Sequence, residues 1–297
     1  MKISHHVPSV DGGTVGGIGC LQNWSCMKIS VSQIKSHVNC PMKAHYEYTL
    51  HRGGLRKPDA LEVGALVHIA LDAILREAMW EPIVEEALAE LEPVRAVELS
   101  ELVDELRPAI AAWKKPEDWR VIGSEMELSV PCGPHTIVGR LDAVVEWNGS
   151  FWHLQHKTLG ASVPVAVYCE QQRTDWHESV YHRMAERASF VPFAGTILNI
   201  VRKLSAKRIA EFPNDALVPP QYLPRSDADV DEAFQDLQQL IDDIATQGDG
   251  GRRVVKCRSS CAGPFRNSLC VYKPVCDGDD VISSENYMDL EPRYAPD

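Results

Sequence analysis

The 297-residue sequence lacks the features that would place a chain in or across a membrane. It has no apolar run approaching the roughly 18 residues that a membrane-spanning helix needs. The stretch from Met1 to Ser30 has no basic start followed by an apolar core, so it is not a secretory signal. We therefore expect a soluble cytoplasmic protein with no membrane contact.

The sequence also lacks an excess of positive charge. It has 30 Lys and Arg against 42 Asp and Glu, which gives a net charge of −12 at pH 7. Proteins that coat nucleic acid through bulk charge normally present a basic surface, so this class is excluded. An enzyme with a local basic channel beside an acidic metal site is compatible with the same balance.

Cysteine, by contrast, is abundant. The chain has nine cysteines, and four of them lie close together near the C-terminus, at Cys257, Cys261, Cys270 and Cys276. An odd total in a chain without a secretory signal indicates metal or cluster ligation rather than disulfides.

The chain is expected to divide into a short leader and one folded domain. Residues 1–28 are rich in Gly, Ser and Val without periodicity, which predicts a disordered leader. The sequence that opens at Met1 recurs at Met27, so Met27 is a candidate natural start, although a chance repeat explains the match equally well. Residues 29–297 are predicted to form the domain.

Within the domain, Ser32 is the expected N-cap of the first helix. Apolar residues at helical spacing predict a helix that begins at Gly64 and further helix from Pro82 to about Trp113. Alternating apolar residues then predict a meander of three strands, at residues 119–130, 136–146 and 151–158. A helix at 170–187, a strand at 195–201 and an acidic helix at 229–245 follow. This order predicts an α/β or α+β fold.

Two adjacent predicted strands carry residues suited to metal chemistry. Asp142 lies on the first, three residues after Gly139. Gln155 and Lys157 share one face of the second strand and His156 points to the other face, because side chains alternate along a strand. An acid, an oxygen donor and a lysine are what metal-assisted phosphodiester cleavage requires.

Glu125 on the preceding strand adds a second carboxylate to this group. Mg²⁺ and Mn²⁺ bind carboxylate and carbonyl oxygens, and such an ion would activate a water and neutralise charge on the scissile phosphate. Lys157 would orient the water or stabilise the developing anion. The alternative, given equal weight, is that Asp142 only ends a strand, Glu125 faces solvent and Lys157 is an ordinary surface residue.

His68 lies at the edge of the core-facing stripe of its predicted helix. A neutral imidazole at such a position can ligate a metal when a partner holds its other nitrogen. The alternative is a half-buried histidine without a function.

The order of these features resembles that of the RecB-type branch of the PD-(D/E)XK nuclease superfamily, which includes small phage and CRISPR-adaptation exonucleases. The similarity spans residues 29–276. Its motifs are a Ser-x-Ser helix leading to Cys40-Pro41, a G-x-x-x-H helix at Gly64 and His68, an acidic strand at Glu125, G-x-x-D at Gly139 to Asp142, a (D/E)-x-K strand at Gln155 to Lys157, and a Q-x-x-x-Y helix at His177 and Tyr181.

The resemblance implies a restriction-endonuclease-like core, with a central mixed sheet flanked by helices and a Cys-rich C-terminal segment. It implies Mg²⁺ or Mn²⁺ as cofactor and Lys157 as the catalytic lysine. His177 and Tyr181 become accessory residues on the helix that contacts DNA. The implied metal ligands are His68, Glu125, Asp142 and Gln155.

Two residues depart from the family pattern. Gln155 replaces the usual acid, which keeps an oxygen donor but removes one negative charge. Metal affinity is expected to fall, and activity to be slow, Mn²⁺-dependent or lost. His177 replaces a glutamine, and an imidazole can imitate only part of the hydrogen bonding of an amide.

The resemblance also implies a [4Fe–4S] cluster held by one early and three late cysteines. The corresponding residues are Cys40, Cys261, Cys270 and Cys276. The usual C-x₂-C is absent, so Cys257 is an alternative to Cys261. Four thiolates at these spacings also suit structural Zn²⁺, and four reduced cysteines without metal are the third alternative.

The predicted function is that of a metal-dependent DNA nuclease, an exonuclease acting on single strands or duplex ends. It would serve DNA repair, recombination or phage DNA processing in a bacterial, archaeal or phage-infected cell. The alternative is a catalytically weakened nuclease-like domain that binds DNA, or a recombination or helicase partner, with a purely structural cluster. Gln155 is the residue that favours this alternative.

Overall fold

The computed structural model describes residues 27–189, 191–204, 206–211, 218–248, 254–257, 261, 270–283 and 285–291. Residues 1–26, which make up most of the expected leader, lie outside this part of the chain. Lys28 already belongs to a strand. No helix among the described residues is both long and apolar enough to cross a bilayer.

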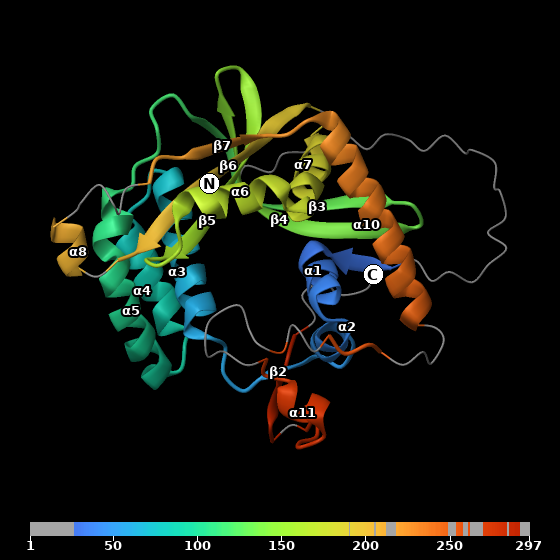
Figure 1. Cartoon of the computed structure of the whole chain (residues 1–297). Coiled ribbons are helices and arrows are strands. Elements are labelled where there is room, and N and C mark those ends of the chain that lie inside the picture. The colour runs from blue at the N-terminus through green and yellow to red at the C-terminus, as the bar shows by residue number, and fades with distance from the viewer. Residues whose placement is uncertain are drawn as a thin grey trace.

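A mixed six-stranded sheet forms the centre of the molecule (Figure 1). The strands run in the order β1-β4-β5-β6-β7, and β3 pairs with β4. The predicted meander β3-β4-β5 is confirmed as antiparallel, whereas β5 and β6 are parallel. The strands are β1 (Lys28–Ser30), β3 (Arg120–Cys132), β4 (His135–Trp147), β5 (Ser150–Gly160), β6 (Phe193–Lys203) and β7 (Gln221–Pro224).

One edge of β4 changes partner along its length. The first half, Thr136–Val138, pairs with β1, and the second half, Ala143–Trp147, pairs with β5. β3 occupies the opposite edge along nearly the whole strand. Residues 139–142 therefore lie between two partners, at a point where the sheet forks.

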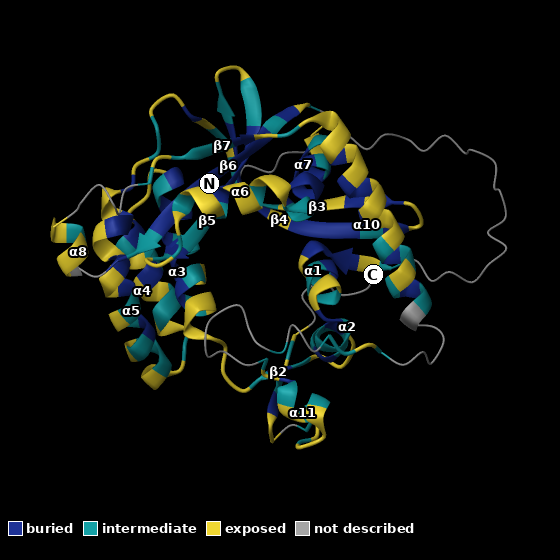
Figure 2. Ribbon diagram, in the orientation of Figure 1, coloured by how far each residue is buried: buried dark blue, intermediate teal, exposed yellow. Residues whose placement is uncertain are grey.

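Helices cover both faces of the sheet, and each face has its own apolar core. One core joins the sheet to α3 (Asp59–Leu75), α4 (Trp80–Ala89) and α5 (Pro93–Ala112). The other joins it to α1 (Val31–Asn39), α7 (Trp176–Ser189) and α10 (Asp227–Gly248). Figure 2 shows the strands as the most continuously buried part of the molecule. The predicted class, a central mixed sheet flanked by helices, is confirmed.

Alternation along β5 decides which side chains meet which helices. Trp152 and Leu154 belong to the core under α3, α4 and α5. His153 lies on the other face, where its ring is 6.3 Å from that of His182 in α7. The same alternation continues into the predicted (D/E)-x-K position.

Helix boundaries differ from the predicted ones for local reasons. The expected helix from Pro82 to Trp113 is two helices, because Pro93 occupies the first turn of α5, where a missing N–H costs nothing. The helix predicted over 170–187 is also two, α6 (Val165–Thr174) and α7. Ser32 is not the first N-cap. Ser30 is, since its hydroxyl accepts from the Gln33 N–H at 3.0 Å.

The C-terminal segment folds back onto the early helices. β2 (Arg52–Gly54) pairs with β8 (Tyr287–Asp289), and an aromatic cluster of Tyr46, Tyr272 and Tyr287 packs beside this pair. Figure 1 shows α11, β2 and α2 together, below the sheet. The remaining elements are α2 (Pro41–Ala44), the π-helical turn η1 (His45–Thr49), α8 (Ala206–Glu211) and α11 (Lys273–Asp277).

Candidate active site

Asp142 lies at the fork and has partners from two other elements. Its Oδ2 atom is 3.5 Å from Nδ1 of His68 in α3. The backbone N–H of His156 donates to the same oxygen at 2.7 Å. β5 pairs with β4 only as far as Leu154, so the Asp142 carboxylate takes the place of a strand partner for His156.

The surroundings of Asp142 keep its carboxylate ionised. Burial acts to raise the pKa of Asp142, but the hydrogen bond with His68 and the charges of His68, His156 and Lys157 lower it more strongly. The net result is a pKa well below the ordinary value. The anionic form is the one that binds a metal ion.

Glu125 lies opposite Asp142 on the neighbouring strand. Ser124 pairs with Ala143 and Met126 with Leu141, which leaves Glu125 across from Asp142. Its φ of 50° is in the left-handed region, a strain of roughly 1–2 kcal/mol for a residue with a side chain. The strand is thus distorted at the acid that faces the fork.

The Glu125 carboxylate is held by an arginine and influenced by other acids. Its Oε2 atom is 3.0 Å from Nε of Arg140. Burial raises the pKa of Glu125, Arg140 opposes this effect, and the charges of Asp142 and Asp72 raise the pKa further. These three carboxylates therefore share one electrostatic neighbourhood.

Gln155 and Lys157 approach the fork from the other face of β5. The ring of His156 lies 5.8 Å from that of His68 and 5.9 Å from that of Trp113, which places His156 under α3 and α5. By alternation Gln155 and Lys157 face α7. In the described part of the chain, neither side chain hydrogen-bonds to Asp142. The charge of Lys157 nevertheless lowers the pKa of Asp142 and of the buried Glu178.

The predicted accessory residues pack inside the molecule. A Cβ at Gly139 would lie 2.7 Å from Cε1 of Tyr181, so the glycine of the G-x-x-D motif allows α7 to approach β4. The rings of His177 and Tyr181 are 4.8 Å apart, and Tyr181 is only 7% exposed. Both residues thus support the fork from the side of the sheet that α7 covers.

Three residues near the site were absent from the sequence analysis as candidates. Asp72 lies four residues after His68 on α3, a spacing that could have identified it as a neighbour on the same helix face. Arg140, inside the G-x-x-D motif, holds Glu125. The deeply buried Glu178 of α7 carried no sequence signal, because its position depends on how α7 packs against β5 and β6.

The cysteines of the predicted cluster come from both ends of the chain. Cys40 joins α1 to α2, and Cys276 lies in α11. Burial raises the pKa of Cys270 and of Cys276, and charge on Cys261 and Cys40 raises both further, so the four thiols are neighbours. No disulfide joins cysteines within the described ranges.

The side chains are not arranged around an ion. Within the described residues, no group of three or more His, Cys, Asp or Glu side chains is placed to hold a metal. At the fork, the Glu125 carboxylate is paired with Arg140 and the Asp142 carboxylate with His68. Binding would therefore require rotation of side chains that are already adjacent.

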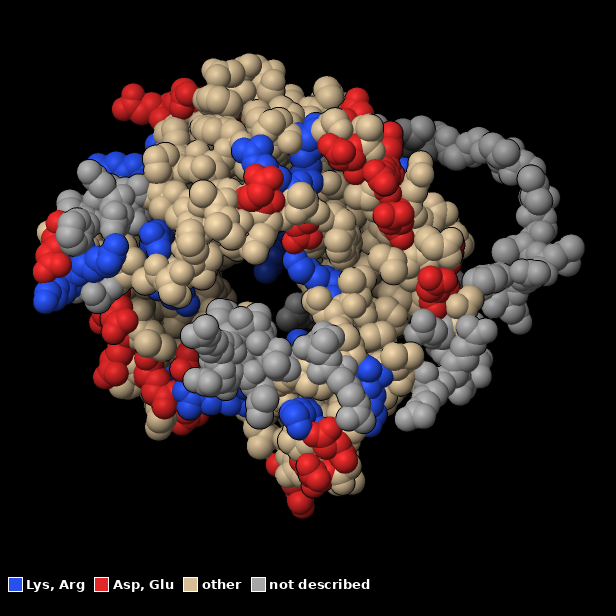
Figure 3. Space-filling view, in the orientation of Figure 1, with Lys and Arg blue, Asp and Glu red and all other residues tan. Residues whose placement is uncertain are grey.

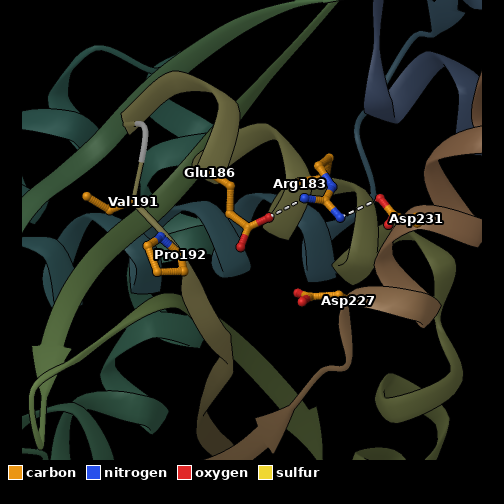
Figure 4. Close-up of a pocket in the computed structure, with 6 residues that line it drawn as sticks. All are labelled: Arg183, Glu186, Val191, Pro192, Asp227 and Asp231. Carbon is orange, nitrogen blue, oxygen red and sulfur yellow. Dashed lines mark hydrogen bonds and ion pairs between the residues drawn. The ribbon is translucent and has the colours of Figure 1, made fainter.

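A separate pocket of about 420 Å³ lies between α7, the start of β6 and α10 (Figure 4). Arg183 bonds there to Glu186 at 2.7 Å and to Asp231 at 2.5 Å, and Asp227 adds a third acid. The acids outnumber the arginine, so the pocket repels phosphate. None of the candidate active-site residues lines it.

Comparison with known families identifies a superfamily for the chain. Residues 28–277 match the model of the PD-(D/E)XK nuclease superfamily. The chain belongs to this superfamily. The resemblance inferred from motif order is thereby confirmed at the level of the superfamily, and so is the restriction-endonuclease-like fold.

A solved structure has the same fold as this PD-(D/E)XK chain. A protein from Eubacterium rectale, described provisionally as an exonuclease, aligns with a TM-score of 0.50 and 11% identity, over 88% of this chain and 98% of that one. The structure of SSO0001 aligns with a TM-score of 0.38 and 12% identity, over 86% and 88% of the two chains. No curated protein sequence matches the chain.

Proposed function

We propose that this chain is a Mg²⁺- or Mn²⁺-dependent deoxyribonuclease that hydrolyses phosphodiester bonds as an exonuclease. One observation carries the proposal: His68 and Asp142 meet at 3.5 Å where the sheet forks, with Glu125 opposite on β3. Ligands of α/β sheets bind where neighbouring strands part, because the crevice leaves polar groups accessible. The superfamily supplies the class of reaction.

The donor set at the fork fits a hard divalent cation. Two carboxylates, Asp142 and Glu125, and the imidazole of His68 would hold it, with Gln155 offering an amide oxygen. A bound ion would lower the pKa of the attacking water and offset phosphate charge. Gln155 removes one negative charge from the site, so we expect Mn²⁺ to support activity better than Mg²⁺.

The chain's own residues have distinct parts in this proposal. Asp142 remains anionic because His68 and Lys157 stabilise its charge. Lys157, on the α7 side of β5, would orient the attacking water or stabilise the developing anion. His177 and Tyr181 would keep α7 against Gly139 and so fix the position of the fork.

The charge distribution supports DNA approach from one side. Figure 3 shows Asp and Glu side chains over α5 and α10, and Lys and Arg side chains, with some Asp or Glu above them, beside the opening at the centre of this face. A single strand or a duplex end fits such a restricted basic area better than a long duplex does. We place the activity in DNA repair, recombination or phage DNA processing in the cytoplasm.

The alternative is a weakened nuclease domain that binds DNA, or a recombination or helicase partner, without cleaving DNA. Gln155 favours it, since the site has one acid fewer than its family pattern. The ion pair between Glu125 and Arg140 also favours it, because the arginine competes with a cation for that carboxylate.

The deciding experiment incubates the full chain with end-labelled single-stranded and duplex DNA in Mn²⁺, in Mg²⁺ and in EDTA. We expect digestion in Mn²⁺, slower digestion in Mg²⁺ and none in EDTA. Lys157→Ala and Asp142→Asn should abolish it, while Lys207→Ala on the exposed α8 should not. Equal digestion by wild type and Lys157→Ala would reject the site, and binding without digestion would support the alternative.

The proposal includes a [4Fe–4S] cluster at Cys40, Cys261, Cys270 and Cys276. Four neighbouring thiols from the two ends of the chain fit the ligand set of such a cluster, and also that of Zn²⁺. The cluster would tie α2 to the C-terminal segment. We expect brown protein that contains iron and sulfide.

Variants separate these options. Cys270→Ser should lose the colour, and Cys132→Ser, which alters a buried free cysteine in β3, should keep it. Cys257→Ser and Cys261→Ser decide which of these two residues is the fourth ligand. If the wild-type protein is colourless and contains one zinc per chain, then the four cysteines bind zinc and not an iron–sulfur cluster.

A further inference from the structure

Asp72 is an unusual residue for the interior of a helix that faces the core. It is 7% exposed, and its Oδ1 atom is buried without a hydrogen-bond partner among the residues that the structure describes. Its Oδ2 atom accepts from Arg76, one turn further along α3. A buried carboxylate oxygen without a hydrogen bond lowers the free energy of unfolding, so such oxygens are normally hydrogen-bonded in folded proteins. Asp72 therefore calls for a role beyond pairing with Arg76.

The position of α3 brings Asp72 to the fork. A Cβ at Gly64 would lie 3.7 Å from Oγ1 of Thr158 on β5, and His68 contacts Asp142 on β4. Each step of four residues advances a helix by about 6 Å, and neighbouring strands are about 4.8 Å apart. Asp72 follows His68 by four residues on the same helix face. The strand beside β4, on the side away from β5, is β3, which carries Glu125.

The electrostatic interactions agree with the placement of Gly64, His68 and Asp72 over β5, β4 and β3 in turn. The negative charge of Asp72 acts on Glu125 and raises its pKa, together with burial and Asp142. α3 also packs directly on β3, β4 and β5. The pair His68 and Asp72 on the helix thus lies over the pair Asp142 and Glu125 on the strands.

We propose that Asp72 is a further acidic residue of the metal site and supplies the negative charge that Gln155 does not. The inference rests on the proposed nuclease function. With Gln155 in place of an acid, the fork has two carboxylates, Glu125 and Asp142, and Asp72 makes a third. Arg76, which is 54% exposed at its side chain, balances Asp72 until a cation binds.

A purely structural role makes a different prediction. If Asp72 served only its ion pair, then removing Arg76 would have the same effect as removing the carboxylate. If Asp72 serves the cation, removing Arg76 frees the carboxylate and leaves metal binding equal or tighter. The two roles are therefore separated by a variant that does not touch the site.

The test measures Mn²⁺ binding to the full chain by electron paramagnetic resonance, without DNA. Asp72→Asn should weaken Mn²⁺ binding about 10-fold or more, the size of effect seen when residues around a metal are replaced. Arg76→Met should bind as wild type or tighter. Adding Gln155→Glu to Asp72→Asn restores one carboxylate and should recover most of the lost affinity.

Each outcome has a defined meaning. Equal affinity in wild type and Asp72→Asn overturns the proposal, and so does an equal loss in Arg76→Met. If Asp142→Asn abolishes binding while Asp72→Asn has no effect, only the role of Asp72 fails. If wild type binds no Mn²⁺, the metal site of the proposed function fails with it. Thermal unfolding of each variant shows whether a loss of affinity reflects a loss of fold.

Discussion

Gly139 shows how one residue without a side chain positions the site. Its Cα faces the ring of Tyr181, which is buried between α7 and β4, and Met184 lies close behind. The residue begins the stretch of β4, ending at Asp142, that pairs with β3 on one edge but with neither β1 nor β5 on the other. The glycine in the motif is therefore explained by the close approach of a helix rather than by a turn.

We predict that Gly139→Ala destabilises the protein by about 1–3 kcal/mol, the usual cost of forcing an extra carbon into a packed core. The new Cβ would meet Tyr181 Cε1 at 2.7 Å, and the ring has little room to move. The matched control is Gly160→Ala at the end of β5, where no atom of the described residues lies within 4 Å of an added Cβ. Urea unfolding midpoints measure both changes. A control that loses as much stability as Gly139→Ala would contradict this explanation.

At the scale of elements, the sequence predicts long strands well and short ones poorly. β3, β4 and β5 are long enough for alternating residues to show a period, and β6 is a long, mostly apolar run. β1, β2, β7 and β8 have three or four residues and depend on partners far along the chain. No local pattern can indicate such pairing.

The same limit applies to the site. The motifs identified His68, Asp142 and Glu125, and the fold brings these three together. The fork itself depends on residues 28–30 pairing with 136–138, more than a hundred positions away, and so was not predictable. The spacing from His68 places Asp72 on the same helix face, but its burial, and an Oδ1 atom without a hydrogen-bond partner among the described residues, become visible only in the structure.

The contact between the chain ends is an element that can be tested alone. Tyr272 is 1% exposed, its ring lies 4.9 Å from that of Tyr46 and 5.7 Å from that of Tyr287, and its hydroxyl donates to the Arg52 carbonyl at 2.5 Å. Its contacts are with the small C-terminal cluster and not with the two large cores of the sheet.

We predict that Tyr272→Ala releases β2 and β8 while the central sheet stays folded. Truncating a buried aromatic residue costs about 3–5 kcal/mol, which is enough to open so small a cluster. Hydrogen exchange should show lost protection at Gly53 and at Met288, its partner in β8, but unchanged protection in β4 and β5. Tyr272→Phe keeps the rings, loses one hydrogen bond worth about 1 kcal/mol, and should keep most protection. Uniform loss across both regions would show that the ends are not a separate unit.

At the scale of the whole molecule, an acidic protein must bind an acidic polymer. The net charge of −12 repels DNA in general, and the acids Glu125, Asp142 and Asp72 add repulsion at the fork itself. Charges farther than about 8 Å from the DNA are largely screened at physiological ionic strength. The local balance at the fork, rather than the total charge, should therefore control affinity.

We predict that DNA affinity depends on whether a cation is bound at the fork. Ca²⁺ has the same charge and ligand preference as the proposed ions, and it should raise affinity for a labelled single strand about 10-fold over EDTA, or 1.4 kcal/mol. The double variant Asp142→Asn, Glu125→Gln should bind better than wild type in EDTA and gain nothing from Ca²⁺. Fluorescence anisotropy at matched ionic strength measures all four states.

The control for this prediction removes charge elsewhere. Glu85→Gln takes one charge from the exposed face of α4 and should leave affinity within about twofold in both conditions, because screening isolates that face. If Glu85→Gln changes affinity as much as the variant at the fork, then total charge governs binding. If Ca²⁺ has no effect on wild type, then the acids at the fork do not meet the phosphates, and DNA binds to another face of the molecule.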